Sequence, residues 1–294
     1  MKRKPLDNPK LLAQCERVKG LIQETARVRA GLERDYFVRW HHYQLNPTVS
    51  LEEIDAVEQE HGVELPEGLV YWLNQVGNGG AGPGTGFHDS ILPQKEPPGT
   101  MHGPFWKPRP WIVNRASEQL CETMTTEEWK TRFDRSGEYR LDPWERSDPR
   151  SRDDGTFVLS GMDTTYLAHL IVVGPERGKV VYMDYDYDCP PMWPKGSAYF
   201  LDWCENWFRE LASGYDIDPT WKFMWQQPGD ENALRRAYQT APNKEYRDEV
   251  LWSFQKFPKL SAETMEFLQG ISDPEHQEFL ESLLKKHAGK RDRA

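Results

Sequence analysis

Residues 50–80 constrain the fold of this chain more than any other stretch, because they predict two short helices joined at a fixed turn. Ser50 and Glu53 form the capping-box pattern, in which each side chain can bond the backbone N–H of the other residue. Gly62 suits the left-handed conformation in which such a helix ends. Pro66 pushes the residue before it into an extended conformation and suits the first turn of a second helix.

Both predicted helices carry an apolar face with three- and four-residue spacing. The face of the first helix consists of Leu51, Ile54 and Val57. The face of the second helix consists of Leu69, Trp72, Leu73 and Val76. The stretch closes with Gly-Asn-Gly-Gly at residues 77–80, and all four residues tolerate positive φ. A tight loop is therefore predicted after the second helix.

Residues 156–186 carry the strongest strand signal in the chain. TFVLSG and YLAHLIVVG predict two strands, and KVVYMDYD predicts a third after a hairpin turn at residues 175–178. Both faces of the second segment are apolar, which is typical of a central strand covered on each side. His169 lies on that segment and is predicted to be a core histidine with a hydrogen-bonded ring. A closing helix is predicted from Ser197 to Leu211, with an apolar face of Phe200, Trp203, Trp207 and Leu211.

The order of these elements resembles the SUKH superfamily, which includes the fungal Smi–Knr cell-wall-assembly regulators and many bacterial toxin-immunity proteins. The opening pattern is a capped helix, a glycine, hydrophobic-Pro-Glu, a second helix with aromatic residues, and Asn-Gly-Gly. The matching positions are Ile54, Glu58, Leu65, Pro66, Leu73, Asn78, Gly79 and Gly80. The later order of strand, turn, strand, aspartates, loop and helix resembles the same family. The resemblance extends to about Leu211 and leaves both ends of the chain unexplained.

The predicted fold class is α+β, with a twisted, mainly antiparallel sheet packed by helices. The sheet is expected within residues 86–186, and the helices are expected at residues 50–61, 66–77 and 198–212. An N-terminal helix is predicted from Pro9 to about Leu32, with Asn8 as its cap. We expect it to pack on the main domain; a contact arm for a partner is the alternative.

The chain changes character after Asp218-Pro219, where prolines separate four short amphipathic segments. Helices are predicted at residues 230–241, 243–257, 261–271 and 274–288. Their predicted buried residues are Leu234, Tyr238, Val250, Leu251, Phe254, Met265, Leu268, Phe279 and Leu283. The predicted organisation is thus an N-terminal helical extension (1–48), a SUKH-like α+β domain (49–214) and a small C-terminal all-helical segment (215–294).

The net charge of −10 is distributed unevenly along the chain. Residues 1–48 hold 10 Lys and Arg against 5 Asp and Glu, or +5. Residues 49–214 hold 15 against 28, or −13, and residues 215–294 hold 12 against 14, or −2. The acidic middle argues against nucleic acid as the main partner, because phosphates would be repelled. It fits attraction to a basic protein, and a surface that serves solubility is the alternative.

The alternating aspartates of DYDYD, at residues 184–188, would share one face of a strand. An EF-hand would need Gly and Glu where Cys189 and Lys195 stand, so that motif fails. We predict instead that this strand end receives Arg or Lys side chains of a partner beside aromatic anchors. The predicted partner-binding residues are Asp184, Tyr185, Asp186, Tyr187, Asp188 and Trp193. A looser cation site and a solvated strand end are the alternatives.

Other chemistry is poorly supported by the sequence. The glycine-rich segment GAGPGTGFHDS follows a helix and lacks the GK[ST] of a phosphate-binding loop, so a lead into the first strand region is predicted. The eight His show no HExxH, and Ser160-Gly161 lacks the context of a nucleophile elbow. No nucleophile, base and orienting group can be assembled, and no metal or cofactor is predicted.

Cysteine usage and hydropathy predict a cytoplasmic location. The four cysteines (Cys15, Cys121, Cys189 and Cys204) lie far apart without any CxxC, which indicates reduced thiols. There is no run of 18 apolar residues, and the basic N-terminus lacks the apolar region of a secretory signal. Neither a membrane span nor membrane binding is predicted.

The resemblance implies a binding protein without catalysis. The predicted function is that of an immunity protein, which neutralises a secreted bacterial toxin by occluding its active face. The predicted partner is a cognate toxin with a basic active face. A regulatory scaffold of the Smi–Knr type, which binds several protein partners, is the alternative. An enzyme would require a convergent polar pocket, which the sequence does not predict.

Overall fold

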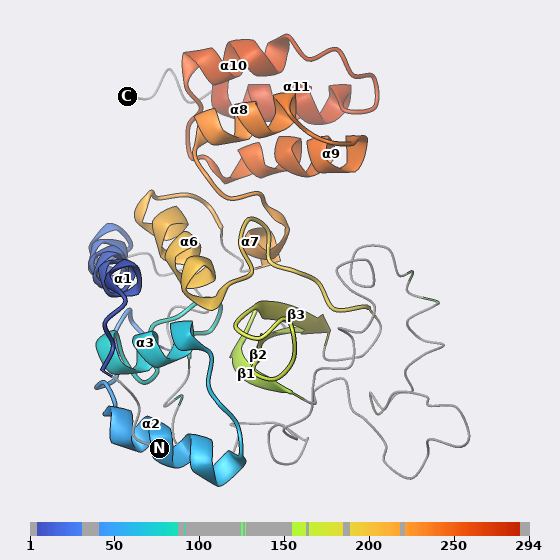
Figure 1. The fold of residues 1–294 in the computed structure, drawn as a ribbon. Coiled ribbons are helices and arrows are strands. Elements are labelled where there is room, and N and C mark those ends of the chain that lie inside the picture. The colour runs from blue at the N-terminus through green and yellow to red at the C-terminus, as the bar shows by residue number, and fades with distance from the viewer. Residues whose placement is uncertain are drawn as a thin grey trace.

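The structure is a computed structural model, shown in Figure 1. It describes residues 5–30, 41–87, 91, 125, 127, 155–162, 165–184, 189–217 and 221–288. The helices are α1 (Pro9–Val28), α2 (Leu51–His61), α3 (Glu67–Gln75), α6 (Phe200–Ala212), α7 (Trp221–Trp225), α8 (Glu231–Gln239), α9 (Lys244–Ser253), η3 (Phe254–Lys256), α10 (Ala262–Gln269) and α11 (Gln277–Ala288). The strands are β1 (Thr156–Gly161), β2 (Tyr166–Ile171) and β3 (Val180–Asp184). The α+β class is therefore confirmed.

The helix pair α2–α3 forms as the sequence predicts. The Oγ of Ser50 accepts from the N–H of Glu53 at 3.2 Å, and a carboxylate oxygen of Glu53 accepts from the N–H of Ser50 at 2.7 Å. These two bonds satisfy backbone donors that the start of a helix leaves unpaired. Gly62 ends the helix at φ 64°, and Pro66 precedes α3. Ile54 and Val57 of α2 are buried, as are Leu69, Val70, Tyr71, Trp72 and Leu73 of α3.

The sheet has the order β1-β2-β3 and both pairings are antiparallel. His169 pairs with Val158 on one side and with Val181 on the other, and a bulge interrupts β1 between Val158 and Ser160. The ring of His169 is buried, and its Nδ1 lies 3.1 Å from the Oγ1 of Thr156. The prediction of a core histidine is confirmed. The part of the predicted sheet region between residues 88 and 154 lies almost wholly outside the described residues.

The glycine-rich loop after α3 packs tightly against two other segments. A Cβ on Gly80, which has φ 82°, would overlap the carbonyl oxygen of Gln44. A Cβ on Gly84 would overlap the carbonyl oxygen of Gly161 at the end of β1. Hydrogen bonds join the loop to the same two segments. The N–H of Ala81 donates to the carbonyl oxygen of Gln44 at 2.7 Å, and the N–H of Thr85 donates to that of Gly161 at 2.9 Å. The glycines therefore allow the backbone to pass between neighbouring segments at close range.

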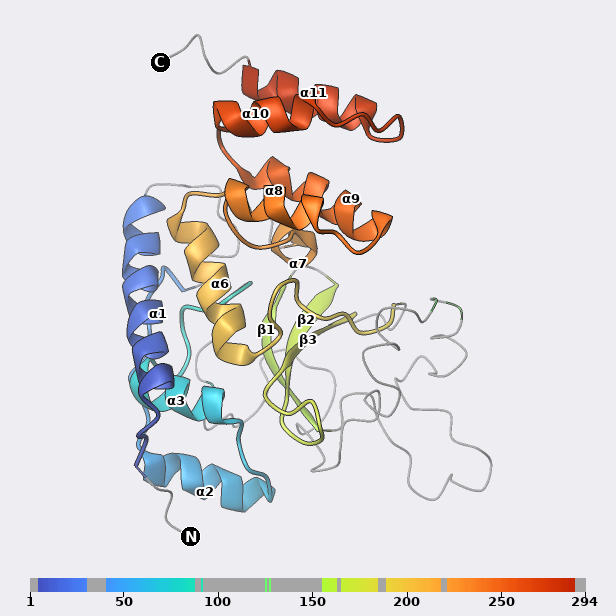
Figure 2. The same ribbon diagram turned by 45° about the horizontal axis from the view of Figure 1, so that its top comes forward.

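Helix α1 belongs to the main hydrophobic core. It lies alongside α6 in both views (Figures 1 and 2), and Cys15, Val18 and Ile22 are buried in the same cluster as the α6 face. The predicted packing of an N-terminal helix on the main domain is thus observed. The helix ends at Val28, a few residues before the predicted end.

The C-terminal helices form a second core. The helices α8 to α11 lie together beyond α6 and α7 (Figure 2), and each falls within its predicted range. Their buried cluster runs from Leu234 to Leu283, whereas Phe223 and Met224 of α7 belong to the first core. The two cores are therefore divided between Met224 and Leu234, with the side chain of Tyr215 packed against both. No helix in the described residues has the length and apolarity needed to cross a membrane.

Candidate partner-binding surface

Asp184 ends β3 and is buried, with only 2% of its surface exposed. Its Oδ2 accepts from the N–H of Cys189 at 2.9 Å, which ties together the two ends of the loop that follows the strand. Residues 185–188, which include the predicted contacts Tyr185, Asp186, Tyr187 and Asp188, lie outside the described residues. The assignment of partner contacts to them stays a prediction. The carboxylate of Asp184 is buried and bonded to the backbone of Cys189, so its observed role is an internal one.

The segment 189–199 covers the outer edge of the sheet. It runs back along β3, where the N–H of Tyr182 donates to Met192 at 2.8 Å and the N–H of Val180 donates to Ala198 at 2.7 Å. The N–H of Phe200 then donates to Gly178 at 3.0 Å as α6 begins. An uncovered strand edge invites pairing with other chains, so this cover protects β3. It also fixes the side chains of the segment on a rigid base.

Two aromatic side chains of this segment flank one lysine. The Nζ of Lys179 lies 5.3 Å from the ring centroid of Trp193 and 5.8 Å from that of Tyr199, which is the range of cation–π contacts. Glu176 forms an ion pair with the same ammonium group. Tyr199 is 57% exposed, while Trp193 is half-buried. We call Lys179, Trp193 and Tyr199 the β3-edge surface; of these, only Trp193 is among the partner contacts that the sequence predicts, and that assignment stays a prediction.

Strand β3, which carries the covering segment 189–199, is joined to α6 by a buried aromatic pair. Tyr182 of β3 is buried, and its hydroxyl accepts from the indole N–H of Trp203 on α6 at 2.8 Å. Burial raises the pKa of the Tyr182 hydroxyl well above its usual range, so the group stays protonated. Trp203 also contacts the ring of Phe87, which itself packs against Trp72 at 5.2 Å between centroids. Tyr182 thus ties β3 to a packed aromatic core that includes α6.

An acidic stretch runs from the start of α2 to the start of α3. Residues 50–67 contain seven Asp and Glu and no Lys or Arg. Glu52, Glu60 and Glu67 are exposed, and within the described part of the chain they make no hydrogen bond or ion pair. No Lys or Arg in the described ranges therefore neutralises these three carboxylates. Such a stretch contributes long-range attraction to a basic molecule, which falls as salt is added.

Four backbone amides of the glycine-rich loop are used within the chain. The N–H groups of Ala81, Thr85, Gly86 and Phe87 all donate to carbonyl oxygens of the chain itself. A phosphate cradle needs such groups to point at the anion. Ser160 beside this loop is fully buried and donates to the carbonyl oxygen of Pro83 at 2.8 Å, so it serves packing. Among the described residues, no group of three or more His, Cys, Asp or Glu could hold a metal ion.

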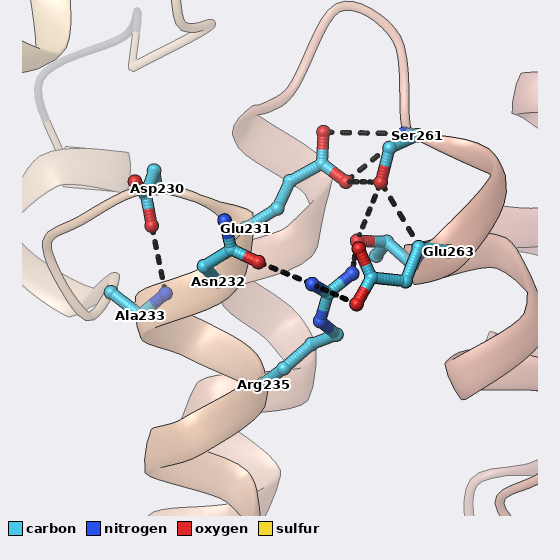
Figure 3. Close-up of polar contacts among 8 residues, drawn as sticks. Asp230, Glu231, Asn232, Ala233, Arg235, Ser261 and Glu263 are labelled. Atoms are coloured by element: carbon cyan, nitrogen blue, oxygen red, sulfur yellow. Dashed lines mark hydrogen bonds and ion pairs between the residues drawn. The ribbon is translucent and has the colours of Figure 1, made fainter.

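A polar cluster joins the starts of α8 and α10 (Figure 3). The carboxylate of Glu231 accepts from the N–H of Ser261 and, at 2.6 Å, from its hydroxyl. Arg235 donates to Thr264 Oγ1 at 2.8 Å and pairs with Glu263 at 2.9 Å. These groups bond one another and supply helix caps, since Ser261 also caps α10. We interpret the cluster as a structural link that holds the start of α8 against the start of α10.

Sequence analysis missed α7, although its signal was present. Trp221 and Trp225 are four residues apart and enclose the apolar pair Phe223 and Met224, a spacing typical of one helical face. The short length of this segment and the prolines near it obscured the pattern. The helix brings Trp225 to the surface beside α9, where the side chain is 39% exposed.

Comparisons with protein-family models, with curated proteins and with solved structures found no match to this chain.

Proposed function

We propose that this chain is a binding protein without catalytic activity, and that it neutralises a secreted bacterial toxin by covering the active face of that toxin. The resemblance to the SUKH superfamily suggests this class. The observation that carries the proposal is the β3-edge surface, where Trp193 and Tyr199 are held at the surface around Lys179. Aromatic side chains of this kind are enriched among the residues that dominate binding energy at protein interfaces.

The physical mechanism is occlusion by a preorganised surface. Because the segment 189–199 is bonded along β3, little conformational entropy is lost when a partner binds to it. The charge of −13 on residues 49–214, including the acidic stretch from α2 to α3, would steer a basic partner toward this domain. Toxins that act on nucleic acid need a cationic face, so a nuclease is the partner class that fits best.

The proposed site of action is the cytoplasm. Cys15 and Cys204 are buried free thiols, and burial raises the pKa of both. Free thiols in the core are usual where the environment keeps cysteines reduced.

Expression together with the product of a neighbouring gene tests the proposal. An immunity gene is expected beside the gene for its toxin, so each neighbouring product is expressed in a bacterial host with and without this protein. We expect one product to arrest growth alone, and we expect growth to recover when this protein is present and the two co-purify. The Trp193→Ala/Tyr199→Ala variant should lose protection, whereas Val28→Ala, an exposed apolar site on α1, should retain it. Full protection by the double variant would reject this surface.

A regulatory scaffold is the second candidate function. The observation in its favour is the separate core of α8 to α11, which gives the chain a second folded surface. A scaffold would co-purify with several partners at once, and no single neighbouring product would be toxic. The growth experiment distinguishes the two functions.

A further inference from the structure

A groove on the C-terminal helices lies between α7, α9 and the start of α11. Its volume is about 560 Å³, and it is lined by Trp225, Asp248, Glu249, Leu251, Trp252, His276 and Phe279. These residues come from three elements that are distant in the sequence, and Figure 1 shows α7 below α9.

The lining of the groove is mostly apolar and aromatic, and two of the residues that line it carry carboxylates. Trp225 is 39% exposed, Trp252 and Phe279 are half-buried, and Leu251 is buried. Asp248 and Glu249 add two acidic groups, both partly open to solvent. Aromatic faces attract cations, and apolar walls accommodate the methylene stem of a long basic side chain. Aromatic walls beside carboxylates therefore suit a cationic side chain better than a neutral or acidic one.

The two carboxylates are held in place by bonds within the chain. Glu249 accepts from Gln227 at 2.9 Å and pairs with Lys195 at 2.7 Å. Asp248 lies 3.2 Å from the Nε2 of His276. Lys195 is partly exposed, so an incoming cation can replace it beside Glu249 while Gln227 still holds that carboxylate. A lysine of the chain thus already pairs with one of the two carboxylates.

One ion pair links the groove to the segment that carries Trp193 and Tyr199. Lys195 lies two residues after Trp193, and its ion pair with Glu249 joins the segment 189–199 to α9. One partner that covers Trp193 and Tyr199 would therefore also reach the groove.

We propose that this groove receives one arginine side chain of the basic partner. The identity of the partner rests on the proposed function, whereas the preference for a cation rests on the groove alone. Arginine fits better than lysine because its planar guanidinium stacks on tryptophan and can bond a carboxylate through two N–H groups. The bound guanidinium lies among the rings of Trp225 and Trp252 and pairs with Asp248 or Glu249.

A small probe tests the chemistry of the groove in the full chain. N-acetyl-arginine methylamide is titrated while the indole N–H signals of Trp225 and Trp252 are followed by NMR, with assignments from Trp225→Phe and Trp252→Phe. The citrulline analogue, which has the same shape without the charge, is the matched control ligand. We expect saturable shifts with the arginine probe and at least tenfold weaker binding of the citrulline probe. Equal binding of both probes, or no shift with either, overturns the proposal.

Three variants distinguish a specific effect on probe binding in the groove from a general effect on folding. Asp248→Asn/Glu249→Gln should weaken the arginine probe about tenfold, whereas Glu245→Gln, an exposed acidic site on α9 outside the groove lining, should leave it unchanged. Lys195→Met should strengthen probe binding, because it removes the cation that competes for Glu249. A damaged fold would weaken binding instead, so strengthening cannot come from misfolding. Weaker binding by Lys195→Met would overturn the proposed competition.

The purified partner then tests the occupant. We expect Trp225→Ala to raise the dissociation constant of the toxin complex about tenfold or more, with an unchanged far-UV circular dichroism spectrum. An unchanged dissociation constant would show that the groove is not part of the interface. That result would not contradict the proposed function. Probe binding without any toxic neighbouring product overturns the proposed function instead. A dimer in solution that Trp225→Ala disrupts would identify a second copy as the occupant and overturn the assignment to a toxin.

Discussion

The ammonium group of Lys256 lies 2.7 Å from a carboxylate oxygen of Glu210, and both side chains are buried, with 0% and 5% exposed. Lys256 closes η3 after α9, whereas Glu210 lies on α6, so the pair joins the two cores. Lys256 also donates to the carbonyl oxygen of Gln227 at 2.9 Å, and Glu210 accepts from Gly229 N–H at 2.7 Å. Burial raises the pKa of Glu210 and lowers that of Lys256, while each charge partly offsets the effect on the other.

Removal of one partner of this ion pair should lower the free energy of unfolding substantially. Lys256→Met leaves the Glu210 carboxylate buried without its cation, and we expect a loss of about 3–5 kcal/mol in the free energy of unfolding. The measurement is urea denaturation followed by tryptophan fluorescence. The double variant Lys256→Met/Glu210→Gln should recover much of the loss, because no isolated charge remains. Lys244→Met, at an exposed ion pair with Glu275, is the control and should change stability little. Similar effects of the two single variants would contradict the role of the buried pair.

Gly80→Ala should destabilise the chain by about 2 kcal/mol or more. The residue has φ 82°, and its Cβ would overlap the carbonyl oxygen of Gln44. Gly20→Ala is the matched control, because Gly20 lies within α1 with open space around it, and alanine favours a helix by about 0.8–1 kcal/mol over glycine. The two substitutions should therefore shift the thermal midpoint in opposite directions. A stabilised Gly80→Ala variant would show that the glycine loop is not packed as described.

The buried thiols should resist alkylation. Burial raises the pKa of Cys15 to about 11 and also raises that of Cys204, so few thiolates form at pH 8. We expect iodoacetamide to modify half-buried Cys189 in the native chain and to reach Cys15 and Cys204 only in urea, as read by peptide mass spectrometry. The unfolded chain loses these thiol protons near pH 8.5, before the folded chain does, so stability should fall as the pH rises from about 8.5 toward 11. Rapid labelling of Cys15 in the native state would contradict its burial.

Asp184 should matter as an anchor of its loop. Asp184→Ala removes the acceptor for the N–H of Cys189 and should cost about 1–2 kcal/mol, whereas Asp184→Asn retains an acceptor and should cost less. Hydrogen exchange at residues 189–199 reports the effect directly, and we expect faster exchange in the alanine variant. Equal hydrogen-exchange rates in both variants and in the parent chain would contradict the proposed anchoring role of Asp184.

Local patterns predicted much of the fold because their signals lie within a few residues. The capping box of Ser50 and Glu53, the turn at Gly62 and the helices α8 to α11 are of this kind. The Lys256–Glu210 pair could not be predicted, since its partners are far apart in the sequence and each alone resembles an ordinary surface charge. The same limit applies to the candidate site. Trp193 was found beside its neighbouring aspartates, but its contact with Lys179 depends on the return of the chain along β3.

The dissociation constant of the purified toxin complex, measured by calorimetry at two salt concentrations, tests the central claim most directly. We predict a constant that rises with salt and that rises at least thirtyfold further in Trp193→Ala/Tyr199→Ala, since each aromatic anchor contributes about 1–2 kcal/mol or more. The salt dependence should weaken in a variant with Glu52, Glu60 and Glu67 changed to Gln. A constant that neither salt nor the loss of the two aromatic side chains changes would contradict binding through this acidic, aromatic domain.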